Sequence, residues 1–399
     1  MLKMLKIIAL SLLFIAHSII SHSAPSHSIK ANEPIIIGMD ADMSAGAAVG
    51  GKAIKRGAEI ALQEINQNGG VLGRPLELMV KDHRGNPARG KKNIDGFAEQ
   101  PNVAAILGGV HTPVALAVLP KIHKHKLIYL DPWAAGTAIV ENGYNPNFVF
   151  RVSVRDSDAG LVLIERAKAR GIKKVALVLE RTGWGRSNEI SLTHAAETNN
   201  IEIVATSWIN WRQKDFTSEF NELMKTQPDA LILVTNAPEG AVVVKTNIVS
   251  GANLPVISHW GIAGGAFVNT LTEQLLQQSD VEVLQTFHFL KMSDTPKASY
   301  VFNAYREKFD PEATKTSIVA QVGIAQAYDL VHLLAKAISA AGSISSEAVR
   351  SELEKIENYA GAVKFYDKPF SSSRHDALLH DDYFMTTFNE NSELIPVEN

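Results

Sequence analysis

Residues able to bind or react with a ligand gather in the loops after predicted strands. The segment 46–52 (GAAVGGK) follows a predicted strand, opens a predicted helix, and matches a phosphate-binding loop at every position but the last. Ala53 stands where that loop needs a Ser or Thr hydroxyl to hold magnesium. We therefore interpret the segment as a small-residue loop through which a helix N-terminus approaches another group closely. That group can still be an anion.

Three of the five tryptophans also lie in such loops, at Trp133, Trp184 and Trp260. In a doubly wound sheet, ligands bind at the carboxyl ends of the strands. An indole supplies a large contact area and can face a cation. These positions favour a ligand-contact surface over the alternative, packing in the core.

Histidine is frequent, and its densest group is His375 and His380 with Asp376, Asp381 and Asp382. Their spacing matches no zinc pattern, which favours a polar loop over a metal site. The chain also lacks the G-x-S-x-G motif of many hydrolases. A Ser–His–Asp enzyme would therefore have to use Ser, His and Asp residues that no sequence motif marks. We predict a non-enzyme with no metal and no cofactor.

The N-terminal residues are typical of a secretory signal peptide. Lys3 and Lys6 precede an apolar run over 7–20, and small residues follow at Ser21, Ser23 and Ala24. The run is too short, and too polar at its end, to predict a membrane span. We expect residues 1–23 to be the signal peptide and the remainder to fold in the periplasm, where ATP and NAD are not supplied.

The net charge and the absence of cysteine limit the kinds of partner that this protein can have. The net charge of −3 gives no basis for binding nucleic acid, which needs a clustered basic excess. The chain has no cysteine, which excludes disulfides and a lipid-modified N-terminal cysteine. We expect a soluble monomer without a stable membrane anchor, whose partner is a small-molecule ligand.

The elements that must position these loops alternate between strand and helix. Short apolar runs predict strands at 34–39, 76–80, 103–107, 127–130, 175–179, 201–205, 230–234 and 255–257, and a β-rich tail at 383–389. Amphipathic stretches predict helices at 52–68, 87–99, 113–124, 161–170, 187–199, 216–225, 239–250 and 319–340. This alternation predicts an α/β fold with parallel sheets covered by helices. The segment 132–150 breaks the pattern and is interpreted as the approach to a crossover.

Several stretches together resemble the periplasmic substrate-binding proteins of branched-chain amino acid ABC transporters, the leucine/isoleucine/valine-binding type. The resemblance covers the chain from about Ile35 onward and is carried by residues 36–46, 57–66, 69–76, 82–87, 108–120 and 151–160. Its most specific motif is Gly-Gly-x-x-Gly-Arg-Pro-Leu at 69–76. The resemblance implies a type I periplasmic binding fold, with two Rossmann-like doubly wound lobes joined by three crossovers. Lobe I would comprise 33–155 plus 285–365, and lobe II 156–284 plus 366–399.

Some of the family's ligand-contact residues have a matching residue in this chain, and others do not. The hydroxyl residue that holds the ligand carboxylate matches Thr112, and the assisting amides of the next loop match Trp133, Ala134 and Ala135. The acidic residue at the lobe crossover matches Asp156. The family often has a hydroxyl where Ala135 stands, so part of the carboxylate clamp differs here.

Further departures concern the rest of the pocket. An aromatic before the second lobe's first helix matches Trp184, but the first-loop aromatic of leucine-type members falls at Gly50. Asn236 stands where leucine-type members have a tyrosine. Trp260 stands where they have the acidic residue that pairs with the ligand ammonium. Asp156 or Glu180 would then have to replace that acid.

The resemblance implies a solute-binding protein that closes its lobes on a ligand and delivers it to an ABC permease. The indoles suggest an aromatic carboxylate, or a cation stacked on an indole, rather than leucine. Two alternatives remain open: a ligand sensor coupled to a membrane receptor, and an exported hydrolase that uses a histidine.

Overall fold

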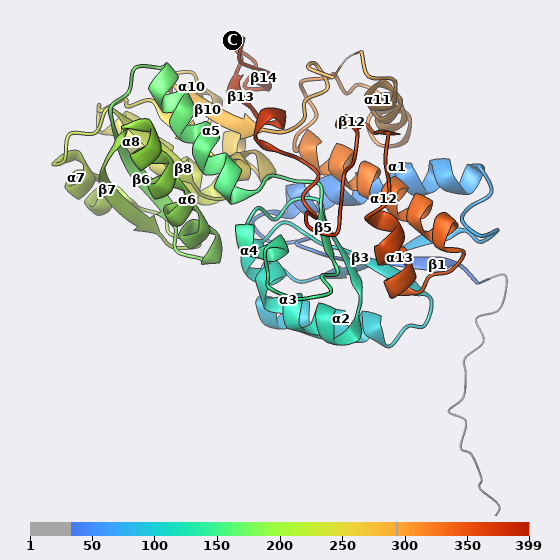
Figure 1. The fold of residues 1–399 in the computed structure, drawn as a ribbon. Helices are drawn as coiled ribbons and strands as arrows, with labels where there is room; N and C mark the ends of the chain where they lie inside the picture. The colour runs from blue at the N-terminus through green and yellow to red at the C-terminus, as the bar shows by residue number, and fades with distance from the viewer. Residues whose placement is uncertain (1–32, 293, 399) are drawn as a thin grey trace, which may run out of the picture.

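The computed structural model describes residues 33–292 and 294–398, so the predicted signal peptide 1–23 lies outside the described residues. These residues form two α/β lobes, each built on its own largely parallel sheet (Figure 1). Within the described ranges, no helix has the length and apolar character needed to cross a bilayer.

The first lobe contains a five-stranded parallel sheet in the order β2-β1-β3-β4-β5. Its strands are β1 (Ile35–Ala41), β2 (Leu76–Asp82), β3 (Val103–Leu107), β4 (Ile128–Asp131) and β5 (Val149–Arg151). All but β2 are buried along their whole length, which explains their continuous apolar runs. The sequence analysis missed β5, which lies at the end of the segment that broke the predicted alternation.

Helices cover both faces of this sheet (Figure 1). They are α1 (Ala48–Gln67), α2 (Pro87–Ala98), α3 (Thr112–His125), α4 (Thr137–Val140), α11 (Pro296–Lys308), α12 (Gln321–Ala341) and α13 (Ser346–Leu353). The helices α2 and α3 pack together on one face, and α1, α12 and α13 lie on the other. The α1–α12 contact is close: a Cβ at Gly57 would lie 2.0 Å from the carbonyl oxygen of Ile324, so only glycine fits there.

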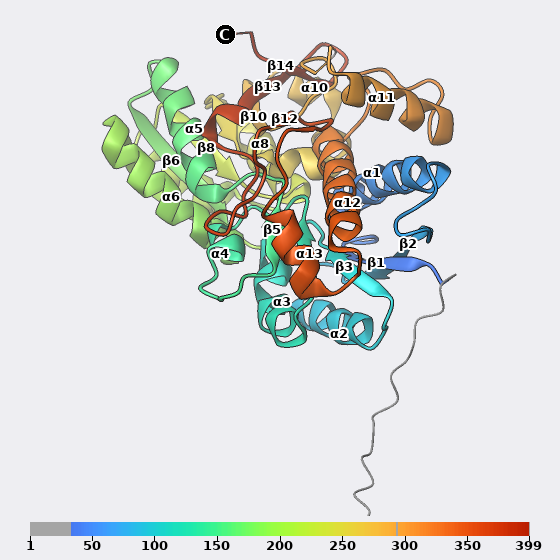
Figure 2. The same ribbon diagram turned by 45° about the vertical axis from the view of Figure 1, so that its right-hand side comes forward.

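The second lobe contains a seven-stranded sheet in the order β14-β13-β10-β9-β8-β6-β7. Its strands are β6 (Lys174–Glu180), β7 (Glu202–Ile209), β8 (Ala230–Val234), β9 (Val256–Ser258), β10 (Val281–Gln285), β13 (Phe384–Phe388) and β14 (Leu394–Pro396). The strands β13 and β14 join antiparallel, so the chain ends on the second lobe (Figure 2). The predicted β-rich tail is confirmed as β13.

Side chains of β6 alternate between two cores, as the period of a strand requires. Val175, Leu177 and Leu179 belong to one apolar cluster, and Ala176 and Val178 to the other. The lobe's helices are α5 (Asp156–Ala169), α6 (Gly183–Asn199), α7 (Thr217–Met224), α8 (Ala237–Val249), α9 (Phe267–Leu271), α10 (Glu273–Leu276) and the 3₁₀ turn η1 (Trp260–Gly264). The pair α5 and α6 packs on one face, and α7 and α8 on the other.

The chain passes between the lobes at 152–155, at 286–289 and at 378–383, where the 3₁₀ turn η2 (His380–Asp382) lies. Two doubly wound lobes joined by three crossovers are the fold that the resemblance implied, and this expectation is confirmed.

One predicted boundary differs from the structure. Residues 366–377 were assigned to the second lobe, yet they lie on the first. The short hairpin of β11 (Tyr359–Ala360) and β12 (Phe365–Tyr366) is anchored there because the Tyr366 hydroxyl donates to buried Asp329 of α12 at 2.8 Å. The backbone N–H of Ala377 then donates to the Arg151 carbonyl on β5 at 2.9 Å. The first lobe therefore extends to Ala377, and only the chain after it returns to the second lobe.

Candidate ligand-binding site between the lobes

In the loop after β1, the Asp42 carboxylate binds the backbone N–H groups at the start of the segment 46–52, which resembled a phosphate-binding loop. Asp42 accepts from the N–H groups of Ala45 at 2.7 Å and Ala47 at 3.0 Å, and lies 3.0 Å from Nε2 of His111. Burial by itself raises the pKa of Asp42, but these hydrogen bonds outweigh it and lower the pKa to about 2. A Cβ at Gly51 would lie 1.9 Å from the Asp42 carbonyl oxygen. The glycines thus serve close approach, and the anion at the amides is Asp42.

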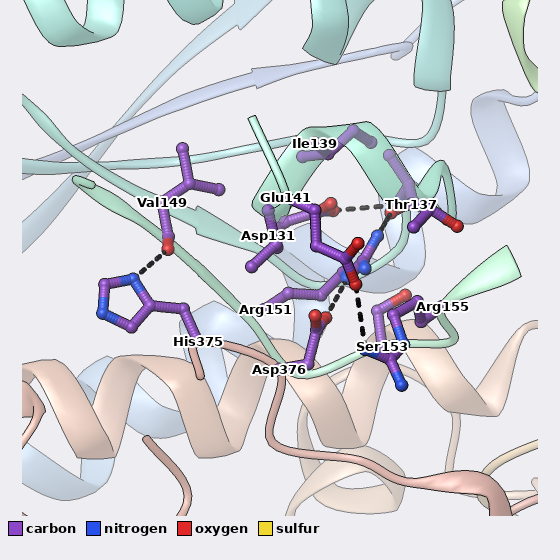
Figure 3. Close-up of polar contacts among 12 residues, drawn as sticks. Asp131, Thr137, Ile139, Glu141, Val149, Arg151, Ser153, Arg155, His375 and Asp376 are labelled. Carbon is purple, nitrogen blue, oxygen red and sulfur yellow. Dashed lines mark hydrogen bonds and ion pairs between the residues drawn. The ribbon is translucent and has the colours of Figure 1, made fainter. Parts of the chain in front are cut away.

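The loop after β4 is held from behind by a buried guanidinium. Arg151 is fully buried, and its Nε donates to Oδ1 of Asp376 at 2.5 Å. Its Nη1 donates to the carbonyls of Ala134 at 3.2 Å and Gly136 at 2.9 Å. Figure 3 shows Arg151 between Asp376 and the loop that carries these carbonyls. The C-terminal segment therefore helps to position a loop far away in sequence.

The same loop is bonded along its whole length. Oδ1 of Asp131 accepts from the N–H groups of Trp133 at 3.0 Å and Ala134 at 2.7 Å. The Ser153 hydroxyl donates to the Trp133 carbonyl at 2.9 Å, and the Asp156 N–H donates to the Ala135 carbonyl at 2.8 Å. A loop restrained at each of these groups presents its side chains to the cleft in one fixed arrangement.

A small cavity lies where this loop meets the second lobe. It has a volume of about 10 Å³, room for about one water molecule. It is lined by Val110, His111, Thr112, Pro113, Trp133, Ala135, Glu180, Trp184, Asn236, Trp260 and Gly261. Both lobes contribute to its wall, and the lobes touch across it.

Most of the predicted site residues line this cavity: Thr112, Trp133, Ala135, Trp184, Asn236 and Trp260. Ala134 and Asp156 are buried and do not. Asp156 accepts from Nε1 of Trp184 at 3.2 Å, so the indole separates it from the cavity. Of the two acids named as substitutes for the family's ammonium partner, only Glu180 lines the cavity.

The tryptophans fill the cleft rather than frame an empty slot. The rings of Trp133 and Trp260 have centroids 5.2 Å apart, which is contact distance, so no ligand ring fits between them. Glycines leave room for the Trp133 indole: a Cβ at Gly264 would lie 2.9 Å from it, and one at Gly323 2.8 Å. A Cβ at Gly50 would lie 3.4 Å from the same ring. The Trp133 indole therefore lies beside Gly50, the position where the resemblance implies an aromatic in leucine-type members.

Thr112 is the first residue of α3 and is buried. Its hydroxyl oxygen accepts from the N–H of Gly136 at 3.2 Å. Since a hydroxyl has one donor and two acceptor sites, its proton stays available for an acceptor in the cavity.

Glu180, at the end of β6, is a buried carboxylate with several donors. It accepts from the N–H of Asn236 at 3.0 Å, from Nδ2 of Asn236 at 2.7 Å, and from Nε1 of Trp211. Burial nevertheless raises its pKa to about 7, because desolvation outweighs these hydrogen bonds. A cationic group placed in the cavity would stabilise the ionised form.

A larger cavity of about 190 Å³ adjoins the first and shares His111 and Asn236 with it. Its other lining residues are Asp42, Ala45, Gly46, Arg84, Gly85, Trp211, Arg212, Lys214, Pro238 and Glu239. Trp211 crosses from the second lobe, and its ring centroid lies 5.2 Å from that of His111 on the first.

Sequence reasoning missed this second cavity, because it ended the strand β7 at residue 205. The strand continues to Ile209, and the polar loop 210–215 that follows was therefore not counted among the strand-end loops. The signal that could have revealed it was the aromatic and basic composition of that loop.

The histidine and aspartate group near the C-terminus is structural. His375 stacks on Phe150 with ring centroids 4.0 Å apart, and its Nδ1 lies 2.7 Å from the Val149 carbonyl oxygen (Figure 3). His380 lies 2.8 Å from Oε2 of Glu165. In the described part of the chain, no group of three or more His, Cys, Asp or Glu side chains is arranged to hold a metal ion.

Comparison with known proteins agrees with the two-lobed architecture. Residues 34–393 match the family model described as "Periplasmic binding protein". The chain belongs to the periplasmic binding protein family. Among curated members it is similar to Leu/Ile/Val-binding protein homolog 3 of Brucella melitensis, with 24% identity over 68% of this chain and 76% of that protein.

Solved structures of similar fold have carried different ligands. The branched-chain amino acid transporter substrate-binding protein of Streptococcus pneumoniae, in complex with isoleucine, has a TM-score of 0.77 and 21% identity, over 91% of this chain and 100% of that one. A solute-binding protein from R. palustris, in complex with 4-hydroxybenzoate, has a TM-score of 0.75 and 20% identity, over 92% of this chain and 96% of that one. At this identity the likeness establishes the fold and leaves the ligand to the side chains of the cleft.

Proposed function

We propose that this protein is a periplasmic solute-binding protein that captures a small amino acid or related carboxylate between its lobes and delivers it to an ABC permease. One observation carries the proposal: side chains from both lobes, among them Thr112 and Glu180, line one cavity. Ligand contacts to both lobes favour the closed state, and a permease can recognise that state. The protein acts as an exported monomer and without a catalytic step.

The cavity between Thr112 and Glu180 has room for about one water molecule, so the lobes must part from this arrangement to admit a ligand there. We infer that this ligand carries both an acceptor and a cationic group. Thr112 supplies a hydroxyl proton from the first lobe, as the carboxylate contact of related proteins requires. Glu180 supplies a carboxylate from the second lobe and takes the role of the acid that Trp260 has replaced. A ligand ammonium near Glu180 gains from its charge, while a neutral or purely anionic ligand gains nothing there.

The body of the ligand is polar. The indoles of Trp133 and Trp260 occupy the space for a side chain beside Thr112. The remaining volume lies in the larger cavity, whose wall carries acidic and basic groups. An aliphatic side chain would leave those groups desolvated without partners, which disfavours leucine.

Mass spectrometry of small molecules that copurify with the protein, followed by a thermal-shift and calorimetric screen, tests this proposal. The screen should include polar amino acids, leucine, aromatic acids and simple amines. Zwitterions with polar side chains are expected to give the largest shift. Tight binding of leucine, or of an aromatic acid without an amino group, would refute the ligand assignment. Failure of every small solute to bind would refute the function.

A further inference from the structure

Charged side chains in the larger cavity between the lobes indicate what the far end of a bound ligand carries. Basic residues reach its wall from both lobes: Arg84 follows β2 on the first lobe, and Arg212 and Lys214 lie in the loop after β7 on the second. Acidic residues also line it, namely Asp42 and Glu239. The charge that this cavity favours therefore depends on which of these groups already has a partner inside the protein.

Both acidic side chains are hydrogen-bonded to backbone donors. The Asp42 side chain is 0% exposed and accepts from the N–H groups of Ala45 and Ala47. Oε1 of Glu239 accepts from the backbone N–H of Arg212 at 2.7 Å, and Glu239 is 4% exposed. Glu239 also lies in the first turn of α8, where the positive end of the helix dipole stabilises a carboxylate. The protein itself thus stabilises both carboxylates, so neither depends on a cation from a ligand.

The basic side chains are less completely paired. In the part of the chain that the structure describes, the side chains of Arg212 and Lys214 make no hydrogen bond or ion pair, and both residues are exposed. Arg84 donates from Nε to Asp82 at 3.3 Å, and its side chain is 57% exposed. Its two terminal nitrogens have no acceptor among the described residues. Like charges around one cavity repel each other, and an anion among them relieves that repulsion.

The larger cavity adjoins the one that Thr112 and Glu180 line. His111 and Asn236 belong to both walls. Trp211 of the larger cavity also donates from Nε1 to Glu180. The larger cavity has a volume of about 190 Å³, and roughly 150 Å³ is enough to hold benzene, so a short side chain with an acidic end has room there. A ligand whose amino group lies at Glu180 can therefore extend its side chain past His111 toward the basic residues.

We propose that the side chain of the ligand ends in an acidic group, a carboxylate or a phosphate, which Arg84 binds from the first lobe and Arg212 and Lys214 bind from the second. This inference rests on the proposed function, because it takes the amino group of the ligand to lie at Glu180. Guanidinium groups bind carboxylates and phosphates through paired, charged hydrogen bonds. Since the cations come from both lobes, the acidic group connects the lobes and stabilises the closed arrangement.

Acidic amino acids and their neutral counterparts are matched probes for this inference. Calorimetry on the full protein compares L-aspartate with L-asparagine, L-glutamate with L-glutamine, and O-phospho-L-serine with L-serine. In at least one pair the acid should bind at least about tenfold more tightly, the worth of a hydrogen bond between charged groups. A preference confined to the third pair identifies the acidic group as a phosphate, and a preference in either of the first two identifies a carboxylate.

Three variants test the residues. Arg84→Gln, Arg212→Gln and Lys214→Gln each remove one positive charge and keep an unbranched side chain. Each should weaken binding of the preferred acid by about three- to tenfold and change binding of its neutral counterpart by less than about twofold. Lys245→Gln on α8 is the matched control, because Lys245 is exposed on the same lobe as Lys214 and lies outside the cavity wall. It should bind both members of the pair as the wild type does.

The outcomes separate this inference from the function on which it rests. Neutral or basic amino acids that bind as tightly as the acids overturn the acidic group and leave the proposed function standing. Acid binding that all three cavity variants retain at wild-type strength overturns it as well. If no amino acid binds, the proposed ligand and this inference fail together.

Discussion

Replacing Asp376 by Asn should destabilise the protein by about 3 kcal/mol, because it leaves Arg151 as a buried charge without its carboxylate. Asp376 accepts from Nε of Arg151 at 2.5 Å, and their side chains are 3% and 0% exposed. Breaking such a pair from one side typically costs about 3–5 kcal/mol. The lower end applies here, since Asp131 also attracts the guanidinium and offsets part of the loss.

A double variant, Arg151→Met with Asp376→Leu, separates the buried charge from the loop contacts. It removes the charges of Arg151 and Asp376, so no unpaired guanidinium remains. Asp131 also loses the attraction of Arg151, but burial already raises its pKa to about 7, so it can become protonated. The Gly136 carbonyl keeps a second donor, the N–H of Ile139 at 3.0 Å, whereas the Ala134 carbonyl loses its Arg151 contact. The expected cost is therefore about 1–3 kcal/mol, that of one buried acceptor left without a partner.

Urea denaturation followed by tryptophan fluorescence measures both variants. Asp381→Asn is the matched control, because Asp381 lies in the same C-terminal chain with a fully exposed side chain, and its midpoint should equal that of the wild type. If Asp376→Asn loses less than about 1 kcal/mol, Arg151 is not an unpaired buried charge in that variant. If the double variant is the less stable of the two, the loop contacts rather than the charge carry the stability, and the reasoning is refuted.

Three further predictions concern the cleft. Because the pKa of Glu180 is raised to about 7, its contribution to the free energy of unfolding is full below pH 4.5 and falls as the pH rises to about 7. The wild type should therefore lose up to about 3 kcal/mol of stability between pH 4.5 and 8 that Glu180→Gln does not lose. Plots of unfolding free energy against pH that run parallel for the two proteins would contradict this prediction. Thr112→Ala should weaken ligand binding by about 1–3 kcal/mol in calorimetry while Thr112→Ser preserves it; equal affinity of all three proteins would exclude Thr112 as a contact. Gly264→Ala places a Cβ 2.9 Å from the Trp133 indole, so it should push the lobes apart and raise the radius of gyration in small-angle scattering. The control Gly46→Ala, whose Cβ would lie 3.9 Å from the nearest atom, should leave the radius unchanged. Equal radii for the two variants would mean that the lobes do not close on Trp133.

The sequence was enough to predict the central strands and the amphipathic helices, because each depends on a local period. Short edge elements were lost. The strand β5 has three residues, and its pairing depends on β4 and on the bridge between Arg151 and Asp376, which is 225 residues away. The same long-range contact explains why the boundary at residue 366 was wrong. No local pattern reveals that a C-terminal segment is held by a guanidinium of the first lobe.

For the candidate site, the resemblance brought together residues that do line one cavity, but it could not predict how they pack. Whether an indole faces a ligand or another indole depends on what lies opposite it. For Trp133 the opposite residues are Gly264 and Gly323, both distant in sequence. The composition of the loop 210–215 could have marked Trp211 as a candidate, but its contact with His111 of the other lobe could not be predicted from the sequence.

The exchange of large and small residues across the cleft supports our proposal that this chain keeps the lobe closure of its family and binds a ligand other than leucine. Gly50 and Trp260 each differ from the leucine-type pattern: one position has lost an aromatic ring and the other has gained one. The Trp133 indole lies beside Gly50 and packs on Trp260, so the lobes still meet through a continuous apolar contact. That contact consumes the volume in which an aliphatic side chain would lie. The free volume then lies on the side of His111 and Trp211, where charged groups line the wall, so the proposed ligand would be selected by charge more than by shape.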